Sequence, residues 1–285
     1  MGEPVMRNVF ESALGAIKAA AEANASHDKT DFRDDEGLLR CGLCGDRKEL
    51  RVWNWFTKSN DVVRRKCKCQ KEREAADQDT EDERSRRNLI RQLRMDAFTD
   101  KSYWKMTFEA DDSKSLDVSI KARRYAERFE QIQEKGLGLL FCGSTGTGKT
   151  FYAAAIVNAL VDRNIPCLMR TVTDIDMWMQ EEGRKACMEK LAAIPLLVID
   201  DMAAERQTEY TQEIVTRIID ERSNRLNPMI VTTNVNINSS EHADQTQSRI
   251  YSRLRKLTVP ILVPGPDRRM QEGRSAFEEM RKLLG

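Results

Sequence analysis

The sequence predicts an α/β fold, with a mostly parallel five-stranded sheet covered by helices on both faces. Two observations support this prediction. From about residue 97, short apolar runs alternate with longer amphipathic segments. The runs have the length of buried strands, and the segments between them have helical periodicity. The expected strands are Leu137–Cys142, Pro166–Arg170, Leu196–Asp200, Met229–Thr233 and Val259–Val263, and the clearest expected helices are Lys149–Arg163 and Thr208–Arg225.

Length and composition set limits on the remaining possibilities. A chain of 285 residues has room for one full domain and one or two small appendages. One third of the residues are charged but the formal net charge is only +1, so any nucleic-acid surface must be local. No apolar run is long enough to span a bilayer. Seven cysteines without an export signal favour reduced thiols and metal ligation. We therefore expect a cytoplasmic protein without a membrane partner.

Composition shifts divide the chain into four regions. Residues 1–35 hold a helical segment, which either binds a partner or docks on its own domain. Residues 36–73 contain four of the cysteines. Residues 74–96 belong to a highly charged stretch without Pro or Gly, which predicts a solvated helical linker. Residues 97–285 form the expected α/β domain.

A phosphate-binding motif follows the first expected strand of that domain. The segment GSTGTGKT matches G-x-x-x-x-G-K-[ST] and opens the helix FYAAAIVNALV. Glycines allow the backbone N–H groups to wrap around phosphate, and the helix N-terminus adds partial positive charge. Lys149 is expected to reach the β- and γ-phosphates of ATP, and Thr150 to offer a hydroxyl to Mg²⁺. The motif comprises Gly143, Ser144, Thr145, Gly146, Thr147, Gly148, Lys149 and Thr150.

Polar residues end the next two buried strands. The run IPLLVIDD places Asp200 and Asp201 at the carboxyl edge of the sheet, beside the phosphate loop. Asp200 is the candidate Mg²⁺ ligand, and Asp201 the candidate for polarising the attacking water; Asp201 could alternatively cap the following helix. The run PMIVTTN ends in Asn234, whose amide is placed to hold that water or the γ-phosphate, unless it is only a turn former.

Four cysteines form a second constellation. Cys41 and Cys44 make a CxxC pair, and Cys67 and Cys69 make a CxC pair after 22 intervening residues. Two close pairs of thiolates suit a tetrahedral, structural Zn²⁺ site, with an iron–sulfur cluster as the alternative and isolated buried thiols as the simplest reading. The other cysteines, Cys142, Cys167 and Cys187, are expected to be small core residues, and His27 and His242 surface residues.

Aromatic and basic residues lie between the two cysteine pairs. Trp53 and Trp55 are expected to alternate onto one face of a strand, among the basic residues Arg51, Arg64, Arg65, Lys66 and Lys68. Such a surface can stack bases and follow a phosphate backbone. It can equally bind a protein, or form the small core of a metal module with a solvated basic rim. The sequence leaves these three interpretations open.

Several segments, in this order, resemble the helicase loaders of the DnaC/DnaI type, which are ATPases of the AAA+ superfamily. The segments are GLGLLFCGSTGTGKTFYAAAIVNAL, LLVIDDMAAERQTEY, IIDERSNR, PMIVTTN and SRIYSRLR, and the resemblance covers residues 97 to 270. It implies a P-loop AAA+ core and an ATP-dependent replication factor. Such a factor binds single-stranded DNA and a hexameric, DnaB-type replicative helicase, delivers the helicase onto DNA, and self-associates through an arginine supplied in trans.

The resemblance also implies roles for individual residues. Asp200 and Asp201 match the Walker B acids and Asn234 the first sensor. Arg253 matches the arginine finger; Arg249 shares its helical face, and Arg255 does not. Arg269 resembles the second sensor, with Arg268 beside it. Thr208 and Tyr210 fall where family members contact single-stranded DNA.

Two departures from the family pattern affect these expectations. The second acid is Asp201 where many AAA+ proteins have Glu, which suggests turnover that is slow or differently arranged. The 22 residues after Val263 are too few for a full helical lid. Two other functions remain possible: an IstB-like ATPase that assists a transposase, and a nucleotide-gated adaptor with little turnover.

Overall fold

The computed structural model describes residues 30–112, 115–202, 208–235 and 245–284. The expected N-terminal helix, His27 and His242 lie outside these residues. The chain forms two units, of which the first ends at Arg86 and the second begins at Arg87. Each unit is described by itself.

The described part of the first unit contains two small antiparallel sheets and the start of a long helix. Strands β1 (Phe32–Arg33) and β2 (Leu39–Arg40) pair with each other, as do β3 (Glu49–Asn54) and β4 (Ser59–Arg64). β3 ends at Asn54, so the prediction that Trp55 continues the strand is wrong. Trp55 lies in the turn that joins β3 to β4.

The charged stretch forms one long helix, α2 (Lys68–Ala97), which begins in the first unit and ends in the second. Its sequence contains neither Gly nor Pro, and most of its side chains are solvated. These features are typical of a helix whose charged residues need no buried partner.

The second unit alternates strands and helices, as the sequence predicts. Its strands are β5 (Gly138–Cys142), β6 (Cys167–Thr171), β7 (Leu196–Asp200), β8 (Met229–Thr233) and β9 (Thr258–Leu262). Its α-helices after α2 are α3 (Leu116–Glu127), α4 (Phe129–Gln133), α5 (Lys149–Val161), α6 (Val172–Glu182), α7 (Arg184–Ala193), α8 (Glu209–Asn224), α9 (Gln245–Leu257) and α10 (Arg268–Leu284), with short 3₁₀ turns η1 (Lys101–Lys105) and η2 (Phe108–Ala110) before α3.

The five strands form one sheet in the order β6-β7-β8-β5-β9, and every pairing is parallel. This confirms the predicted five-stranded parallel sheet. In such a sheet the carboxyl ends of all strands meet at one edge. Strand β5 lies between β8 and β9, and β7 lies beside β8, so the phosphate loop and the ends of β7 and β8 share that edge.

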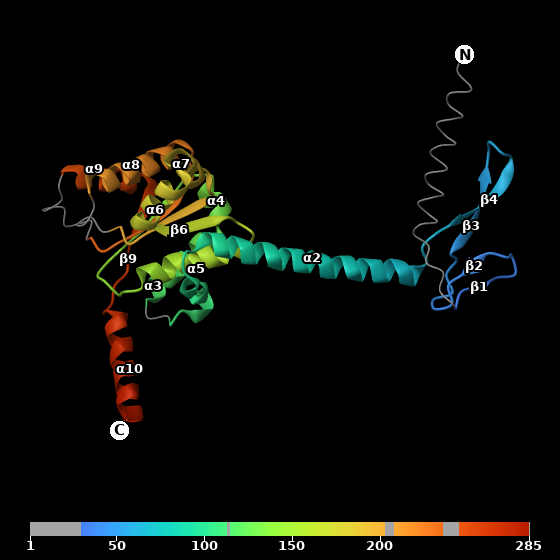
Figure 1. Ribbon diagram of the computed structural model, residues 1–285, viewed down its shortest axis with the longest axis horizontal. Coiled ribbons are helices and arrows are strands. Elements are labelled where there is room, and N and C mark those ends of the chain that lie inside the picture. Colours follow the sequence, from blue (N-terminus) through green and yellow to red (C-terminus); the bar gives the residue numbers. More distant parts are fainter. Residues whose placement is uncertain (1–29, 113–114, 203–207, 236–244, 285) are drawn as a thin grey trace, which may run out of the picture. The chain divides into compact units, whose positions relative to one another are not determined.

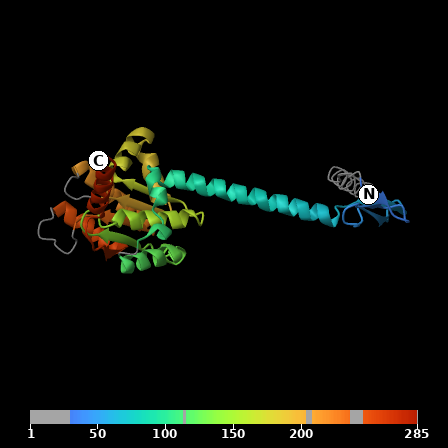
Figure 2. The ribbon, with the colours of Figure 1, turned by 90° about the horizontal axis from the view of Figure 1, so that it is seen from below.

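Helices cover both faces of the sheet (Figure 1), and each face has its own apolar core. Helices α3 and α5 pack on one face against Leu139, Phe141 and Val198; Figure 2 shows the unit from this side. Helices α6, α7, α8 and α9 pack on the other face against Leu140, Ile199 and neighbouring strand residues. Because successive strand residues alternate between faces, nearly continuous apolar runs are required to fill both cores.

Two further expectations concern the state of the cysteines and the length of the apolar helices. All seven cysteines are free thiols, and Cys142, Cys167 and Cys187 are buried as predicted. Within the described residues, no helix has the length and apolar character needed to cross a membrane.

Candidate nucleotide site and metal centre

The phosphate loop joins the end of β5 to the start of α5. Gly143 has a φ of +145°, and a Cβ at this position would lie 2.5 Å from the carbonyl oxygen of Val263. The backbone just after β9 therefore approaches the loop so closely that a side chain is excluded. Ser144 and Thr147 are joined across the loop, because the Thr147 hydroxyl donates to the Ser144 carbonyl over 3.0 Å.

Lys149 is the first residue of α5, and its side chain turns back over the loop. Its Nζ donates to the carbonyl oxygens of Gly143 at 3.0 Å and Ser144 at 2.7 Å. The residue is 7% exposed, which is unusual for a lysine. The ammonium group is thus held at the mouth of a loop built from backbone N–H groups, where it suits an anionic ligand.

Thr150 and Asp200 meet although they are far apart in sequence. The Thr150 hydroxyl lies 3.0 and 3.2 Å from the two carboxylate oxygens of Asp200, and the Thr232 hydroxyl donates to the same carboxylate at 2.6 Å. Burial raises the pKa of the Asp200 carboxyl, and the two hydroxyl donors oppose this shift. A buried carboxylate beside a hydroxyl provides the oxygen ligands that Mg²⁺ prefers.

A further polar contact of the site joins Asp201, which follows Asp200, to Asn234, just after β8. The Asn234 amide donates to the Asp201 carboxylate at 3.3 Å, and the Asp201 backbone N–H donates to the Thr232 hydroxyl at 2.8 Å. Asp201 has a φ of +51°, in the left-handed region that Asp adopts more readily than most residues with a side chain. The ends of β7 and β8 therefore place both acids and the amide at one edge, as the sequence predicts.

Arg268, at the start of α10, also lies at the phosphate loop. Its backbone N–H donates to the Gly146 carbonyl at 2.9 Å, and its guanidinium carbon is 3.4 Å from the position that a Cβ on Gly148 would occupy. The guanidinium also pairs with Asp112 at 3.1 Å. The side chain of Arg269, which the resemblance favours for this role, lies outside the described residues. Two adjacent arginines in the sequence offered no local signal for choosing between them.

Arg253 lies on α9, and its guanidinium pairs with the Asp220 carboxylate of α8 at 2.7 Å. Both side chains are about half exposed, so this contact is a surface ion pair of small energetic value. Arg255 is exposed, and the side chain of Arg249 lies outside the described residues. Arg253, which the resemblance identifies as the arginine finger, is therefore exposed at the surface.

The two residues expected to contact DNA lie at the start of α8. The hydroxyl of Thr208 accepts a hydrogen bond from the Thr211 N–H at 3.3 Å and so caps the helix. Tyr210 is 45% exposed, with the guanidinium of Arg184 5.5 Å from the centre of its ring. Thr208 therefore has a structural role in the fold whether or not it binds DNA.

The four predicted metal ligands converge in the first unit. The Sγ atoms of Cys41, Cys44, Cys67 and Cys69 all lie within 4.8 Å of one another. Two of these separations, from Cys69 to Cys41 and to Cys67, are 3.4 Å. Backbone N–H groups of Cys69 and Asp46 lower the pKa of the Cys44 thiol to about 6, which favours the thiolate. Four thiols at these separations fit a tetrahedral zinc ion.

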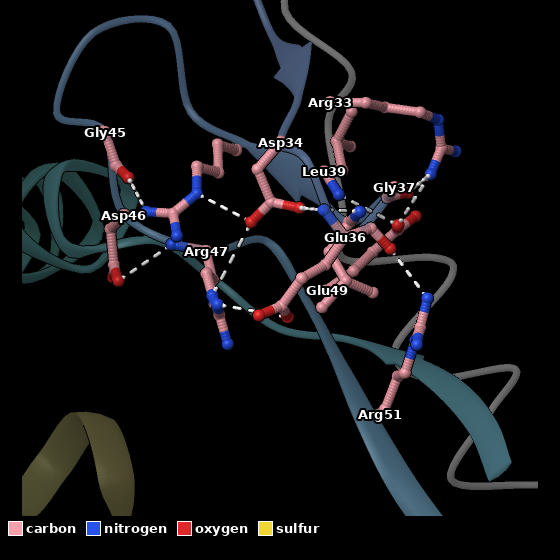
Figure 3. Close-up of polar contacts among 12 residues, drawn as sticks. Arg33, Asp34, Glu36, Gly37, Leu39, Gly45, Asp46, Arg47, Glu49 and Arg51 are labelled. Atoms are coloured by element: carbon pink, nitrogen blue, oxygen red, sulfur yellow. Dashed lines mark hydrogen bonds and ion pairs between the residues drawn. The ribbon is translucent and has the colours of Figure 1, made fainter.

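Carboxylates tie the loops around this cluster together (Figure 3). Asp34 accepts hydrogen bonds from the Leu38 N–H at 3.0 Å, from the Glu36 N–H at 3.1 Å and from Arg40 at 2.8 Å. The Arg40 guanidinium is the largest cause of the lowered pKa of Asp34. Lys48 and Asp31 form a buried pair at 2.6 Å. These contacts hold the loops in place where few apolar side chains are available.

The parallel sheet with its phosphate loop, and the two acids at the same edge, define an ATP-binding protein with a P-loop AAA+ core. The model of a protein family described as "IstB-like ATP binding protein" matches residues 70–252. The chain belongs to this family.

Curated relatives bear names from DNA replication. The replicative helicase loader DnaC of Escherichia coli (strain K12) is 33% identical over 146 residues, which cover 49% of this chain and 58% of the relative. The replicative helicase loader DnaI of Bacillus subtilis (strain 168) is 25% identical over 150 residues, covering 47% of this chain and 48% of the relative. The chain thus spans about half the length of the curated relatives that it matches.

Solved structures resemble the same part of the chain. A crystal structure of the DnaI is 28% identical with a TM-score of 0.50, covering 60% of this chain and 95% of that chain. A crystal structure of the DnaC helicase loader is 25% identical with a TM-score of 0.51, covering 58% of this chain and all of that chain. The predicted resemblance to DnaC/DnaI proteins is confirmed.

Proposed function

We propose that this protein is an ATP-dependent helicase loader, which binds single-stranded DNA and a DnaB-type replicative helicase and delivers the helicase onto DNA. The observation that carries the proposal is the contact between Thr150 and Asp200 beside the phosphate loop. It supports a nucleotide site in a chain whose relatives bear the name replicative helicase loader.

The residues of the site have distinct tasks in ATP hydrolysis. Loop N–H groups and Lys149 bind the β- and γ-phosphates of ATP. Thr150 and Asp200 would hold Mg²⁺, which neutralises charge on those phosphates. Asp201 accepts a hydrogen bond from the attacking water, and Asn234 orients the Asp201 carboxylate through the contact described above. Arg268 lies beside the loop and is our candidate for the second-sensor role, in place of Arg269.

The site needs one further cation opposite the γ-phosphate, and we assign it to Arg253 of a neighbouring copy. Its half-exposed position on α9 supports this assignment, because a finger supplied in trans must be accessible at the surface. Assembly then completes the site, so that hydrolysis follows self-association. Thr208 and Tyr210 on α8 are the proposed contacts to single-stranded DNA.

The metal centre has a structural task in this proposal. Cys41, Cys44, Cys67 and Cys69 would hold zinc in a closed site with no open position for chemistry. Zinc would supply most of the folding free energy of the surrounding loops.

The test compares the Arg253→Ala variant with Arg255→Ala, an exposed neighbour on the same helix. Phosphate release is measured with single-stranded DNA and a DnaB-type helicase present. We expect Arg253→Ala to lower the rate by about 10³-fold or more, whereas Arg255→Ala stays close to the original chain. Equal rates in the two variants would exclude the trans finger.

Co-purification with the helicase, with and without ATP, tests the biological role. A stable complex supports loading, and failure with every candidate helicase contradicts it. The name of the matching family favours one other function, that of an ATPase that assists a transposase. Capture of a transposase in place of a helicase would support that function. Tight ATP binding without phosphate release would indicate a nucleotide-gated adaptor.

A further inference from the structure

The β3–β4 hairpin exposes large apolar side chains to solvent. Trp53 is 46% exposed, Trp55 82% and Phe56 55%, and two valines on the strands are about half exposed. The rings of Trp53 and Trp55 meet edge to face, with centroids 6.5 Å apart and planes at 89°. Exposed aromatic rings gathered on one small hairpin are a feature of interaction sites rather than of a buried core.

Strand pairing shows which side chains share the face of Trp53. Cross-strand partners lie on the same face, and the register pairs Trp53 with Asn60 and Arg51 with Val62. The next pair toward the base of the hairpin is Glu49 with Arg64. This face therefore presents an aromatic ring, a valine, an amide and two arginines.

Negative charge on this face is confined to its base. Glu49 is 5% exposed, and it accepts hydrogen bonds from the Leu39 N–H at 3.0 Å and from Arg33 at 3.1 Å. The other carboxylate of the two strands, Asp61, pairs with Val52 and so lies on the opposite face. The solvent-exposed part of the Trp53 face in β3 and β4 is therefore positively charged.

Arg51 keeps its charge available to a ligand. Its guanidinium donates to the backbone carbonyl of Glu36 at 2.6 Å, which positions the side chain without neutralising it (Figure 3). Arg64 lies 3.9 Å from the largely buried Glu49 carboxylate. Lys58 is exposed in the turn next to the tryptophans.

A basic recess lies in the same unit, close to the base of the hairpin. It is lined by Arg40, Arg47, Lys68 and Lys71 together with Cys44, Gly45 and Asp46. Arg47 and Lys48 lead directly into β3, and the Arg65 N–H that follows β4 donates to the Lys48 carbonyl at 2.8 Å. Basic residues therefore flank the base of the hairpin, where the Asp34 carboxylate pairs with Arg40 and Arg47.

We infer that the β3–β4 hairpin is a binding site for single-stranded nucleic acid, distinct from the proposed contacts at the start of α8. Bases stack on Trp55 and Trp53, and Arg51 and Arg64 contact the phosphates that connect them. The inference rests on residues of the first unit and does not depend on ATP hydrolysis or helicase loading.

The chemistry of the face favours single-stranded nucleic acid over an acidic protein segment. Every base offers a flat π surface that can stack on an exposed indole, and its phosphate places negative charge within reach of nearby arginines. An acidic protein segment matches the arginines but offers no regular partner for the Trp55 ring. A double helix keeps its bases stacked internally and cannot use the rings in this way.

The first experiment uses intrinsic fluorescence of the full chain with zinc present. The chain has four tryptophans, and replacing Trp104 and Trp178 by Phe leaves Trp53 and Trp55 as the reporters. We expect an oligothymidylate to quench their emission, with an affinity that falls as salt rises, because phosphate contacts release counterions. Absence of quenching at low salt would overturn the inference.

The second experiment measures binding of a labelled oligothymidylate by anisotropy, without nucleotide and in a Tyr210→Ala background that weakens the proposed α8 site. We expect Trp55→Ala to lower the affinity about 5- to 100-fold, and Trp55→Phe to restore most of it, because Phe still stacks. Trp55 is exposed in a turn, so its loss leaves the fold intact. Phe277→Ala, which removes an exposed ring from α10, is the matched control and should have no effect.

Two other results would contradict the inference. In one, Trp55→Ala leaves DNA affinity unchanged but abolishes capture of a DnaB-type helicase, which identifies the hairpin as a protein interface. In the other, Trp55→Ala and Phe277→Ala lower affinity equally, which identifies a nonspecific effect. Failure of the Arg253 test above would leave the hairpin result standing, so the two proposals are separable.

Discussion

The two units of this protein are stabilised by different means. Within residues 30–86 the buried apolar side chains are Leu38, Leu39 and the thiols Cys41 and Cys67, and ion pairs hold the surrounding loops. The second unit fills two apolar cores, one on each face of its parallel sheet. A small module buries too little apolar surface to offset the loss of chain entropy, and a metal held by the four cysteines would supply the missing stabilisation.

The two units place their candidate binding residues in different surroundings. In the second unit the binding residues lie on loops at one edge of a sheet whose interior is already close-packed. In the first unit the apolar side chains that could build a core are instead exposed on the β3–β4 hairpin. Metal ligation by the cysteines would leave those side chains free for the recognition proposed above. Four predictions test this division, from the largest expected effect to the smallest.

Removal of the metal should unfold only the first unit. We expect Cys67→Ser, or a strong chelator, to remove stabilisation on the order of 10 kcal/mol from the cysteine module. The melting transition of the second unit should stay unchanged, because its cores contain no metal ligand. Metal analysis and calorimetry provide the measurements, with Cys187→Ala as a control that keeps about one zinc per chain. A single transition that shifts as a whole would show that the units are not independent.

Arg222, on α8, is the most unusual buried residue of the second unit. It is fully buried, and its guanidinium donates to the carbonyl oxygens of Leu191, Ile194, Pro195 and Pro228. Burial lowers its pKa to about 9, so it remains charged at neutral pH.

We expect Arg222→Met to destabilise the second unit by about 2–5 kcal/mol, because several buried acceptors lose their donor. Arg217→Met, on the exposed side of the same helix, should change stability by less than about 0.5 kcal/mol. Urea unfolding measures both. Similar midpoints for the two variants would mean that the carbonyl oxygens find other donors.

Replacing the Asp200 carboxylate should raise the stability of the second unit and abolish ATP hydrolysis. Its carboxylate is desolvated, so Asp200→Asn removes an unfavourable buried charge while the Thr232 hydroxyl keeps an acceptor. We expect the nucleotide-free variant to gain about 1 kcal/mol of stability and to lose ATP hydrolysis. Thermal melting and phosphate release are the measurements, with Asp176→Asn on α6 as the control. A lower melting temperature would show that the carboxylate stabilises the empty site.

A surface pair should have the smallest effect. Arg163 pairs with Glu130 and lowers the pKa of that carboxyl below its usual value of 4.5. An acid whose pKa is lowered by folding stabilises the folded state at pH values above its unfolded-state pKa. This contribution is lost as the pH falls through the folded-state pKa. Glu130→Gln should therefore lower the melting temperature slightly at neutral pH, and the difference should shrink below pH 4.5 and vanish once the pH is below the lowered folded-state pKa. A difference that grows in acid would contradict this sign.

Local patterns were sufficient for much of the second unit. Strands β7 and β8 match the predicted boundaries, because each is a continuous apolar run ended by a polar residue. Strand β6 begins one residue later than predicted, at Cys167, because Pro166 has no N–H for a ladder hydrogen bond. The convergence of the four cysteines was also predictable, since two close thiol pairs have few other uses in a reduced chain.

Other features depend on contacts between residues that are distant in sequence. The position of Arg268 beside Gly148 follows from the return of β9 along β5. Likewise, no local pattern marks Arg222 as a buried donor or Asp220 as the partner of Arg253. The exposure of Trp53 and Trp55 could not be predicted either, because the local pattern shows neither that the strand ends at Asn54 nor which of its faces is covered.

The sequence by itself determined the parallel α/β fold, the phosphate loop and the cysteine cluster. Each arises from short-range chemistry: glycines that permit a tight loop, apolar runs of strand length, and thiols in close pairs. The tertiary structure alone showed that Arg268 lies at the phosphate loop and which side chains of the hairpin remain exposed. Those outcomes depend on strand order and cross-strand register, which arise only when distant segments pack together.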